Sequence, residues 1–395
     1  MTPPVVMIAA VEPSADALGA ALIREMRQRA PHLTFTGCGG PQMQAEGFES
    51  LFDIDIFSVM GFTDVAKVIP AAWSRARQLA RRAAQGDVVC AVFVDGWTFS
   101  RLSAKRIRQR APNLPIVKYG APQVWASRPQ RTAFVRDHFD LVLALLPFEP
   151  PIFEEAGTRA LFVGNPNFEA MAATPRSGKA FRTRHGLEGR DLLAVLPGSR
   201  KGEVSRLLSI FGDATTLAAQ SVRGLVPVIP LAPSVAEQVV TATREWPVPP
   251  LCIPPEERYD LFEAADVALA ASGTVTTEIA MAGTPMVVGY RVDPLTAFWA
   301  KRVLITEYIS IVNIFAGREV IPERLQDDCT PDQLSADIIR LFTDDDARRT
   351  QLTAYRQLLP ALIGEGNTAG RAAEAVLGLL DPEDTVDLHR NAKGQ

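Results

Sequence analysis

The sequence has 395 residues, of which 47% are hydrophobic and 22% charged, and its formal net charge is −4. This composition is that of a globular protein and excludes a disordered or fibrous chain, and the length favours two domains over a single core. Because the chain as a whole carries no positive field, no nucleic-acid partner is expected.

The cysteines are the first feature that limits the chemistry. Cys38, Cys90, Cys252 and Cys329 are far apart, form no Cys-x-x-Cys pair and have no histidine at zinc-ligand spacing. We therefore expect no metal site and no disulfide framework.

Residues 5–11 follow no positively charged leader, and no apolar run approaches the roughly 18 residues of a spanning helix. A cytoplasmic protein is expected.

Short apolar runs alternate with helical patterns along the chain, which is typical of parallel sheets covered on both faces. In the first half we predict helices at 16–29 and 73–84 and strands at 5–11, 88–94, 116–119 and 141–145. The second half restarts the pattern, with strands at 192–196, 226–230, 267–271 and 286–290. The fold class is therefore α/β, with two doubly wound units in tandem.

The domain boundary is expected near 165–186, where prolines and glycines interrupt the periodicity. We predict a first domain over 1–170, completed by a carboxyl-terminal helix within 361–380, and a second domain over 171–360. Residues 381–395 form a polar, charged tail without a packing signal.

Chemistry is expected in the loops after the strands, because ligands of open parallel sheets bind beyond the carboxyl ends of the strands. The first strand is followed by Glu12-Pro13-Ser14-Ala15-Asp16, which opens a helix. Ser14 is either a helix cap or part of a site.

Two loops of the second half are suited to phosphate. Residues 196–203 read Leu-Pro-Gly-Ser-Arg-Lys-Gly-Glu, in which glycine allows close approach and the basic pair neutralises charge. Residues 271–278 read Ala-Ser-Gly-Thr-Val-Thr-Thr-Glu and end a strand where a helix begins, with Glu278 suited to ribose hydroxyls. The alternatives are a plain turn for the first loop and a capping role for Glu278. No Walker or Gly-x-Gly-x-x-Gly pattern is present, so we predict a nucleotide diphosphate site without a cofactor.

Several blocks of the sequence, in order, resemble the signature of the lipid-A-disaccharide synthase family. The resemblance covers about residues 5–380 and is carried by residues 12–16, 39–47, 59–62, 145–149, 196–200, 271–278 and 287–291.

The resemblance implies an inverting GT-B glycosyltransferase with two Rossmann-like domains that face a cleft. Such an enzyme joins UDP-2,3-diacylglucosamine to 2,3-diacylglucosamine 1-phosphate and forms the β-1′,6 disaccharide of lipid A and UDP. It also implies a peripheral protein of the inner membrane of a Gram-negative bacterium, and it is compatible with a homodimer. The residues expected to bind the UDP-sugar are Gly198, Ser199, Arg200, Ser272, Gly273, Thr274, Glu278 and Asn313.

The sequence departs from the family pattern on the acceptor side. The family's acidic loop carries a second aspartate, its supposed catalytic base, but Thr98 takes that place here. A threonine does not accept a proton at neutral pH, so Asp95, Glu12 or Asp16 is expected to be the base. The alternatives are a diverged paralogue that uses another acceptor or is inactive, and a UDP-sugar-binding regulatory or scaffold protein.

The segment 59–73 is expected to contact the membrane surface. It carries apolar side chains at helical spacing and is followed by several arginines that suit anionic headgroups. An ordinary core-facing helix is the alternative. The predicted contact residues are Phe62, Val65, Ile69 and Trp73.

Overall fold

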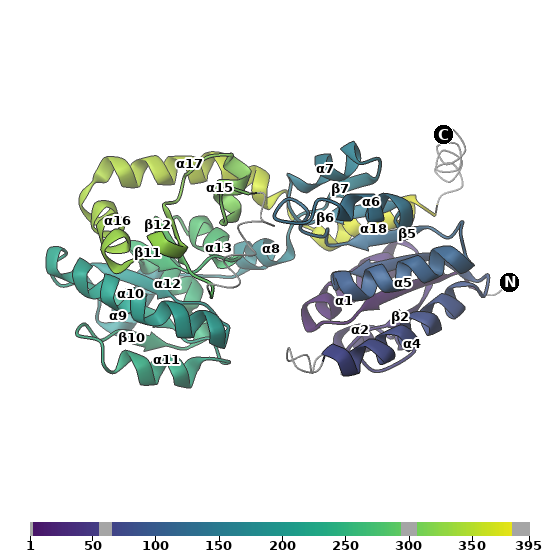
Figure 1. The fold of residues 1–395 in the computed structure, drawn as a ribbon, viewed down its shortest axis with the longest axis horizontal. Helices are drawn as coiled ribbons and strands as arrows, with labels where there is room; N and C mark the ends of the chain where they lie inside the picture. The colour runs from purple at the N-terminus through teal and green to yellow at the C-terminus, as the bar shows by residue number, and fades with distance from the viewer. Residues whose placement is uncertain (1–2, 55–64, 294–305, 381–395) are drawn as a thin grey trace. The chain divides into compact units, whose positions relative to one another are not determined.

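In the computed structural model of the chain, the described residues are 3–54, 65–293 and 306–380. The chain divides into an N-terminal unit, Met1–Glu169 with Ile363–Gln395, and a second unit, Ala170–Leu362. Each unit is built on a parallel sheet accompanied by helices (Figure 1). The predicted α/β fold with two Rossmann-like sheets is confirmed.

The described part of the N-terminal unit holds a seven-stranded sheet in the order β3-β2-β1-β4-β5-β6-β7. Its strands are β1 (Val5–Ala10), β2 (Thr34–Cys38), β3 (Glu49–Ser50), β4 (Val88–Val94), β5 (Ile116–Tyr119), β6 (Leu141–Ala144) and β7 (Arg159–Phe162).

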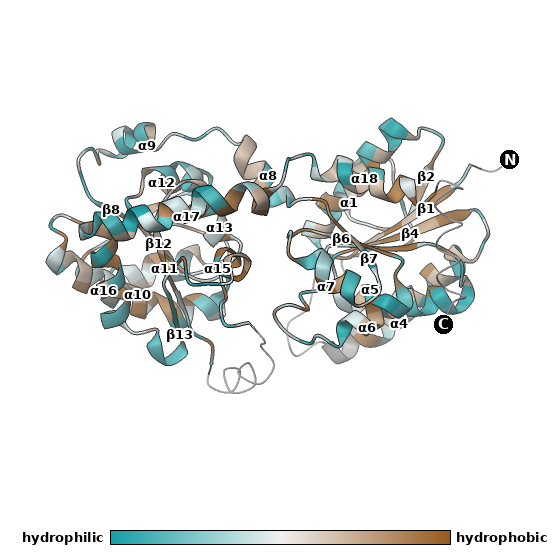
Figure 2. Ribbon diagram, turned by 90° about the horizontal axis from the view of Figure 1, so that it is seen from above, coloured by the Kyte–Doolittle hydropathy of each residue, from teal (hydrophilic) through white to brown (hydrophobic). Residues whose placement is uncertain are grey.

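Both faces of this sheet are buried because successive side chains of a strand point to opposite sides. In β1, Met7 packs into one core together with α4 and α5, whereas Ile8 packs into the other with α1 and α18. The apolar strands β1 and β4 are brown in Figure 2. The helices of the unit are α1 (Pro13–Arg29), α2 (Pro41–Ala45), α4 (Val65–Ala83), α5 (Trp97–Arg110), α6 (Arg131–His138), α7 (Glu149–Glu155) and α18 (Thr368–Gly378), with α8 (Pro166–Ala173) at the boundary between the units.

The described part of the second unit holds a six-stranded sheet in the order β10-β9-β8-β11-β12-β13. Its strands are β8 (Leu192–Leu196), β9 (Val226–Pro230), β10 (Leu251–Ile253), β11 (Val267–Ala270), β12 (Met286–Tyr290) and β13 (Glu323–Leu325). The helices are α9 (Gly178–His185), α10 (Lys201–Ser221), α11 (Ala236–Thr243), α12 (Arg258–Ala264), α13 (Val275–Met281), α15 (Ile311–Ala316), α16 (Pro331–Thr343) and α17 (Asp345–Ile363), with 3₁₀ turns at Pro255–Glu257 and Gln326–Asp328.

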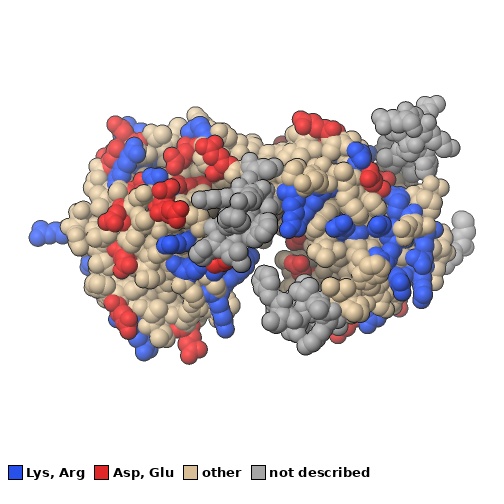
Figure 3. Space-filling view, viewed as in Figure 1, with Lys and Arg blue, Asp and Glu red and all other residues tan. Residues whose placement is uncertain are grey.

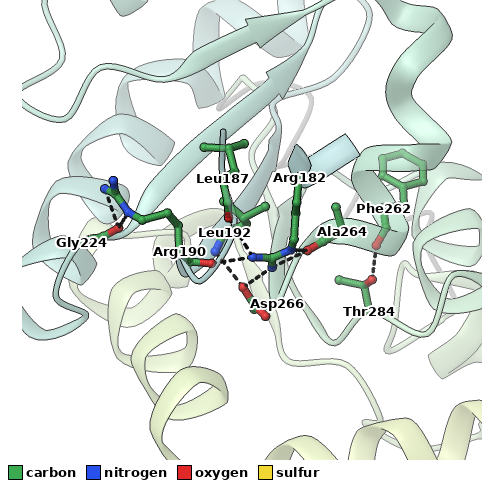
Figure 4. Close-up of polar contacts among 9 residues, drawn as sticks. All are labelled: Arg182, Leu187, Arg190, Leu192, Gly224, Phe262, Ala264, Asp266 and Thr284. Atoms are coloured by element: carbon green, nitrogen blue, oxygen red, sulfur yellow. Dashed lines mark hydrogen bonds and ion pairs between the residues drawn. The ribbon is translucent and has the colours of Figure 1, made fainter. Parts of the chain in front are cut away.

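Arg182 of α9 fixes the start of the two central strands of the second sheet. Its guanidinium donates to Asp266 Oδ2 at 2.8 Å and to the carbonyl oxygen of Ala264 at 2.6 Å (Figure 4). The same Asp266 oxygen accepts the backbone N–H of Leu192 at 2.8 Å. Since Leu192 begins β8 and Asp266 precedes β11, this one ion pair holds both strands in register.

Each sheet has one point where the strand order reverses. The chain leaves β1 toward β2 and β3 and returns with β4 on the other side of β1, and it does the same at β8 and β11. Loops at such a switch point diverge from each other and leave room for a ligand. The predicted catalytic carboxylates Glu12 and Asp95 follow β1 and β4, and the two phosphate loops follow β8 and β11.

Candidate active site

Glu12 and Asp95 lie at the switch point of the N-terminal sheet. The register pairs Ala10 of β1 with Val94 of β4, so the two carboxylates leave neighbouring strand ends, and both residues are exposed. Burial of the Glu12 carboxyl, and secondly the negative charge of Asp95, raise the pKa of Glu12 above its ordinary value. A raised carboxyl pKa beside a second carboxylate is the arrangement of a general base at a reaction site.

A buried lysine, Lys118, contacts the backbone of Asp95. Lys118, in the middle of β5, is 1% exposed and donates from Nζ to the carbonyl oxygens of Asp95 at 2.7 Å and Tyr119 at 3.2 Å. Burial lowers the pKa of Lys118 to about 8, against the opposing charges of Asp95, Glu12 and Glu149. The bond to Asp95 holds a residue whose φ of 46° lies in the left-handed region. Sequence reasoning missed Lys118, although a lone lysine within the apolar strand 116–119 was a visible signal.

Glu149 is the second buried ionisable group that sequence reasoning did not select. Its carboxylate is 3% exposed, accepts the indole N–H of Trp125 at 3.0 Å and accepts the backbone N–H groups of Leu145 and Leu146, both at 3.1 Å. Burial raises the pKa of Glu149 to about 7. Glu149 therefore orders the loop after β6 and contributes negative charge beside Lys118.

Asp16, the third predicted base, is engaged in holding the backbone. Its carboxylate is 2% exposed and accepts the N–H groups of Gly40 at 2.8 Å, Gln42 at 2.9 Å and Met43 at 3.1 Å. These donors begin α2, so Asp16 acts as a cap supplied by another helix. With three of its lone pairs occupied, Asp16 is the weakest of the three candidates. Ser14, in contrast, makes no cap, because α1 begins after Glu12 without a side-chain cap bond.

The first loop of the second unit follows β8. Gly198 has a φ of +106°, and a Cβ atom there would lie 2.8 Å from Glu203 Oε2, so the turn requires glycine. Arg200 donates to Glu203 Oε1 at 2.8 Å while its side chain stays 81% exposed. Ser199 is fixed through its carbonyl oxygen, which accepts the Ser234 hydroxyl at 2.7 Å. The loop thus offers an exposed guanidinium beside a turn that a phosphate can approach.

The second loop follows β11 and opens α13. No atom lies within 4 Å of a Cβ built on Gly273, so the backbone is open at this point. Thr274 precedes α13 without a side-chain cap bond, and the N–H groups of Thr276 and Thr277 donate to the carbonyl oxygens of Gly273 and Thr274. Glu278 has a side chain only 12% exposed, its nearest cation is Arg258 at 3.9 Å, and burial raises its pKa. No side-chain hydrogen bond of Glu278 to another described residue is present, so its carboxylate is free to accept hydroxyl groups.

Asn313 is connected to this loop by hydrogen bonds. It is fully buried, its Nδ2 donates to Ile321 O and Glu323 Oε1, both at 2.8 Å, and its Oδ1 accepts the N–H groups of Val320 at 2.8 Å and Ile321 at 2.9 Å. All the hydrogen-bonding capacity of the amide is used within the protein.

Glu323 connects Asn313 to the loop that follows β11. Its carboxylate accepts the N–H of Ile309 at 2.8 Å and the hydroxyl of Ser310 at 2.6 Å. Ser272 in turn donates its hydroxyl to Ile309 O at 3.0 Å. Asn313 was predicted to bind the donor, and this stays a prediction; its observed bonds connect it through Glu323 and Ile309 to Ser272.

The predicted membrane contacts are described only in part. Phe62 lies outside the described residues, and Val65 belongs to α4 but its side chain lies outside them. Ile69 is 52% exposed and Trp73 is 46% exposed. None of the described helices combines the length and the apolar content needed to cross a bilayer.

Within the described ranges, His, Cys, Asp and Glu side chains form no group suited to a metal ion.

The fold and the two switch-point sites define a class of protein. Two tandem Rossmann-like units occur in GT-B glycosyltransferases and in UDP-GlcNAc epimerases. The chain superposes on MurG of Acinetobacter baumannii with a TM-score of 0.58 at 14% identity, over 95% of this chain and 99% of that one. It superposes on UDP-GlcNAc 2-epimerase of Neisseria meningitidis bound to UDP-GlcNAc with a TM-score of 0.57 at 12% identity, over 95% and 100% of the two chains.

Sequence comparison gives the family within this class. Residues 6–374 match the family model described as lipid-A-disaccharide synthetase. The chain is 37% identical to the lipid-A-disaccharide synthase of Rhodospirillum centenum, over 100% of this chain and 99% of the relative. It is 40% identical to that of Paramagnetospirillum magneticum, over 95% and 97%. The chain belongs to the lipid-A-disaccharide synthase family of glycosyltransferases, and the resemblance seen in the sequence is confirmed.

Proposed function

We propose that the chain transfers 2,3-diacylglucosamine from its UDP donor to the 6-hydroxyl of 2,3-diacylglucosamine 1-phosphate. The observation that carries this proposal is the family match, which runs through both units and includes the loops at both switch points. It favours a synthase over a regulatory UDP-sugar-binding protein.

The second unit is the proposed donor site. Arg200 and the open backbone at Gly273 are suited to the two phosphates, and Glu278 to the ribose hydroxyls. As the bond from the anomeric carbon to the diphosphate breaks, its electron pair leaves with UDP. Positive charge around the diphosphate stabilises this developing negative charge.

The N-terminal unit is the proposed acceptor site, with Asp95 as the base and Glu12 beside it. The carboxylate takes the proton of the acceptor's 6-hydroxyl, and the oxygen forms a bond to the anomeric carbon from the face opposite UDP, which inverts the configuration. Lys118 does not touch the substrate. Its charge favours the ionised form of Glu12, and its hydrogen bond holds the backbone of Asp95.

The test is an activity assay of purified protein with both acylated substrates. Asp95→Asn is expected to lower kcat about a hundred- to ten-thousandfold while UDP affinity stays unchanged, since only the proton acceptor is lost. Asp137→Asn, an exposed aspartate of α6 in the same unit, is the matched control and is expected to keep full activity.

Two outcomes contradict the proposal. Full activity of Asp95→Asn would refute Asp95 as the base and leave Glu12→Gln as the next variant to measure. An inactive wild type that gains activity in Thr98→Asp would mean that the loop has lost its chemistry and that the native reaction uses another acceptor.

We also propose that the N-terminal unit lies at the surface of the inner membrane through α4. Ile69 and Trp73 are exposed there, and α4 and α5 pack against each other. Neither helix carries an acidic residue, and both are rich in arginine. Such a face suits anionic headgroups. Vesicle flotation tests this, and binding unchanged by the double variant Ile69→Ser with Trp73→Ser would contradict it.

A further inference from the structure

An aromatic pair at the start of α5 holds two arginines close together. The rings of Trp97 and Phe134 lie 5.8 Å apart, edge to face at 83°. The guanidinium of Arg131 lies 5.5 Å from the Trp97 ring, and that of Arg101 lies 5.3 Å from the Phe134 ring. Stacking on aromatic faces offsets the repulsion between the two cations, so the arginines remain gathered without an acidic partner.

The positive charge of this cluster is not neutralised. Burial, and then the charges of Arg128 and Arg101, lower the pKa of Arg131 from its ordinary value. Within the described part of the chain none of these three arginines forms an ion pair, whereas Arg136 of the same helix α6 pairs with Asp137 at 3.0 Å. Like charges held together without a counter-ion favour the binding of an anion.

The surroundings of the cluster are basic as well. Figure 3 shows Lys and Arg atoms gathered over α5 and α6, with few acidic atoms among them. Helix α5 carries no Asp or Glu, and its basic residues are Arg101, Lys105, Arg106, Arg108 and Arg110.

One member of the aromatic pair is close in sequence to the proposed base. Trp97 comes two residues after Asp95 and begins α5. The acceptor of the proposed reaction carries its phosphate and its reacting hydroxyl on one sugar ring, so the groups that bind them must be neighbours. Guanidinium groups match the geometry of a phosphate with paired N–H donors.

We propose that Arg101, Arg128 and Arg131 form an anion subsite that binds the phosphate of the acceptor sugar. The assignment of the ligand rests on the proposed function. A phosphodiester headgroup of the membrane would offer similar chemistry, but a subsite beside Asp95 places a bound phosphate where the acceptor must lie.

The experiment compares two short-chain acceptor analogues, diacylglucosamine with and without the 1-phosphate. Calorimetry measures their binding to the full chain, and steady-state kinetics measure KM for each at saturating donor. We expect wild type to prefer the phosphorylated analogue. Arg131→Met and Arg101→Met keep apolar packing on the rings, and each is expected to weaken binding of the phosphorylated analogue about ten- to a hundredfold, with KM for the donor unchanged.

The control is Arg136→Met, which removes a paired arginine from the same helix and is expected to leave both analogues unaffected. Arg101 is exposed, so its variant tests the subsite even if the half-buried Arg131 is needed for folding.

Each outcome has one meaning. Phosphate-dependent binding without turnover would support the subsite and contradict the proposed function. If Arg101→Met and Arg131→Met turn over both analogues as wild type does, the subsite is overturned and the proposed function stands. Loss of binding to anionic vesicles in these variants, with unchanged preference between the analogues, would overturn it in favour of a headgroup site.

Discussion

Replacing Lys118 by methionine removes a charge that the folded protein buries at a cost. Burial lowers the pKa of Lys118 from 10.5 to about 8. Since one pKa unit corresponds to about 1.4 kcal/mol, the protonated lysine lowers the free energy of unfolding by about 3 kcal/mol at pH 7. Methionine has a similar length and carries no charge, although it leaves the carbonyl oxygens of Asp95 and Tyr119 without this donor.

The pH dependence of stability separates the effect of the charge from the effect of the lost hydrogen bonds. Because the folded pKa of Lys118 is below the unfolded value, the unfolded chain binds more protons between about pH 8 and 10.5. The free energy of unfolding of wild type, relative to Lys118→Met, is therefore expected to be constant below that window and to rise through it by about 3 kcal/mol.

Urea unfolding of both proteins at pH 7, 8, 9 and 10 measures this difference. Lys105→Met, which removes an exposed lysine of α5, is the control and is expected to show no change with pH relative to wild type. A difference between wild type and Lys118→Met that stays flat, or that falls with rising pH, would refute the reasoning.

The same lysine and three other residues give further predictions. In Lys118→Met the pKa of the Glu12 carboxyl, which burial and the charge of Asp95 already raise, is expected to rise further in an NMR titration, because the opposing positive charge of Lys118 is lost. Asn313→Ala is expected to lower the free energy of unfolding by about 2 to 5 kcal/mol in a thermal melt, because buried groups lose their partners, whereas a pure ligand contact would leave stability unchanged. Glu278→Ala and Arg200→Ala are each expected to weaken UDP binding about tenfold or more in calorimetry with little change in melting temperature, and unchanged affinity in both would refute the donor site.

The strands that carry the sites were predictable because they are long apolar runs. The predicted 88–94, 116–119 and 192–196 coincide with β4, β5 and β8. The strands β2, β3, β7, β10 and β13 were missed. Of these, β3, β10 and β13 have only two or three residues and carry no periodicity that distinguishes them from a loop. Helix α4 begins eight residues before the predicted 73, because Pro70 lies within it rather than ahead of it.

Candidate site residues could be selected from the sequence where they follow a strand, but not where they lie inside the fold. Glu12 and Asp95 were selected by position alone, and their catalytic role stays a prediction. Lys118 and Glu149 were missed because charged side chains are expected at the surface. Only the structure shows that both are buried. The bonds of Asn313 within the protein were not predictable either, because its partners lie eight and ten residues along the chain and give no local pattern.

The resemblance seen in the sequence implies an aspartate in relatives where this chain has Thr98, and the charges around Thr98 are consistent with a residue other than aspartate. An aspartate at 98 would lie one turn from Arg101 on α5, at a spacing where opposite charges pair. That pair would occupy an arginine which, in this chain, has no acidic partner among the described residues. With threonine at 98 the arginines stay open to an anion, and the positive charge of the buried Lys118 opposes the rise in the pKa of Glu12 that burial and Asp95 cause. Proton acceptance and anion binding are thus divided between neighbouring groups, so a missing aspartate at one position does not by itself imply a missing reaction.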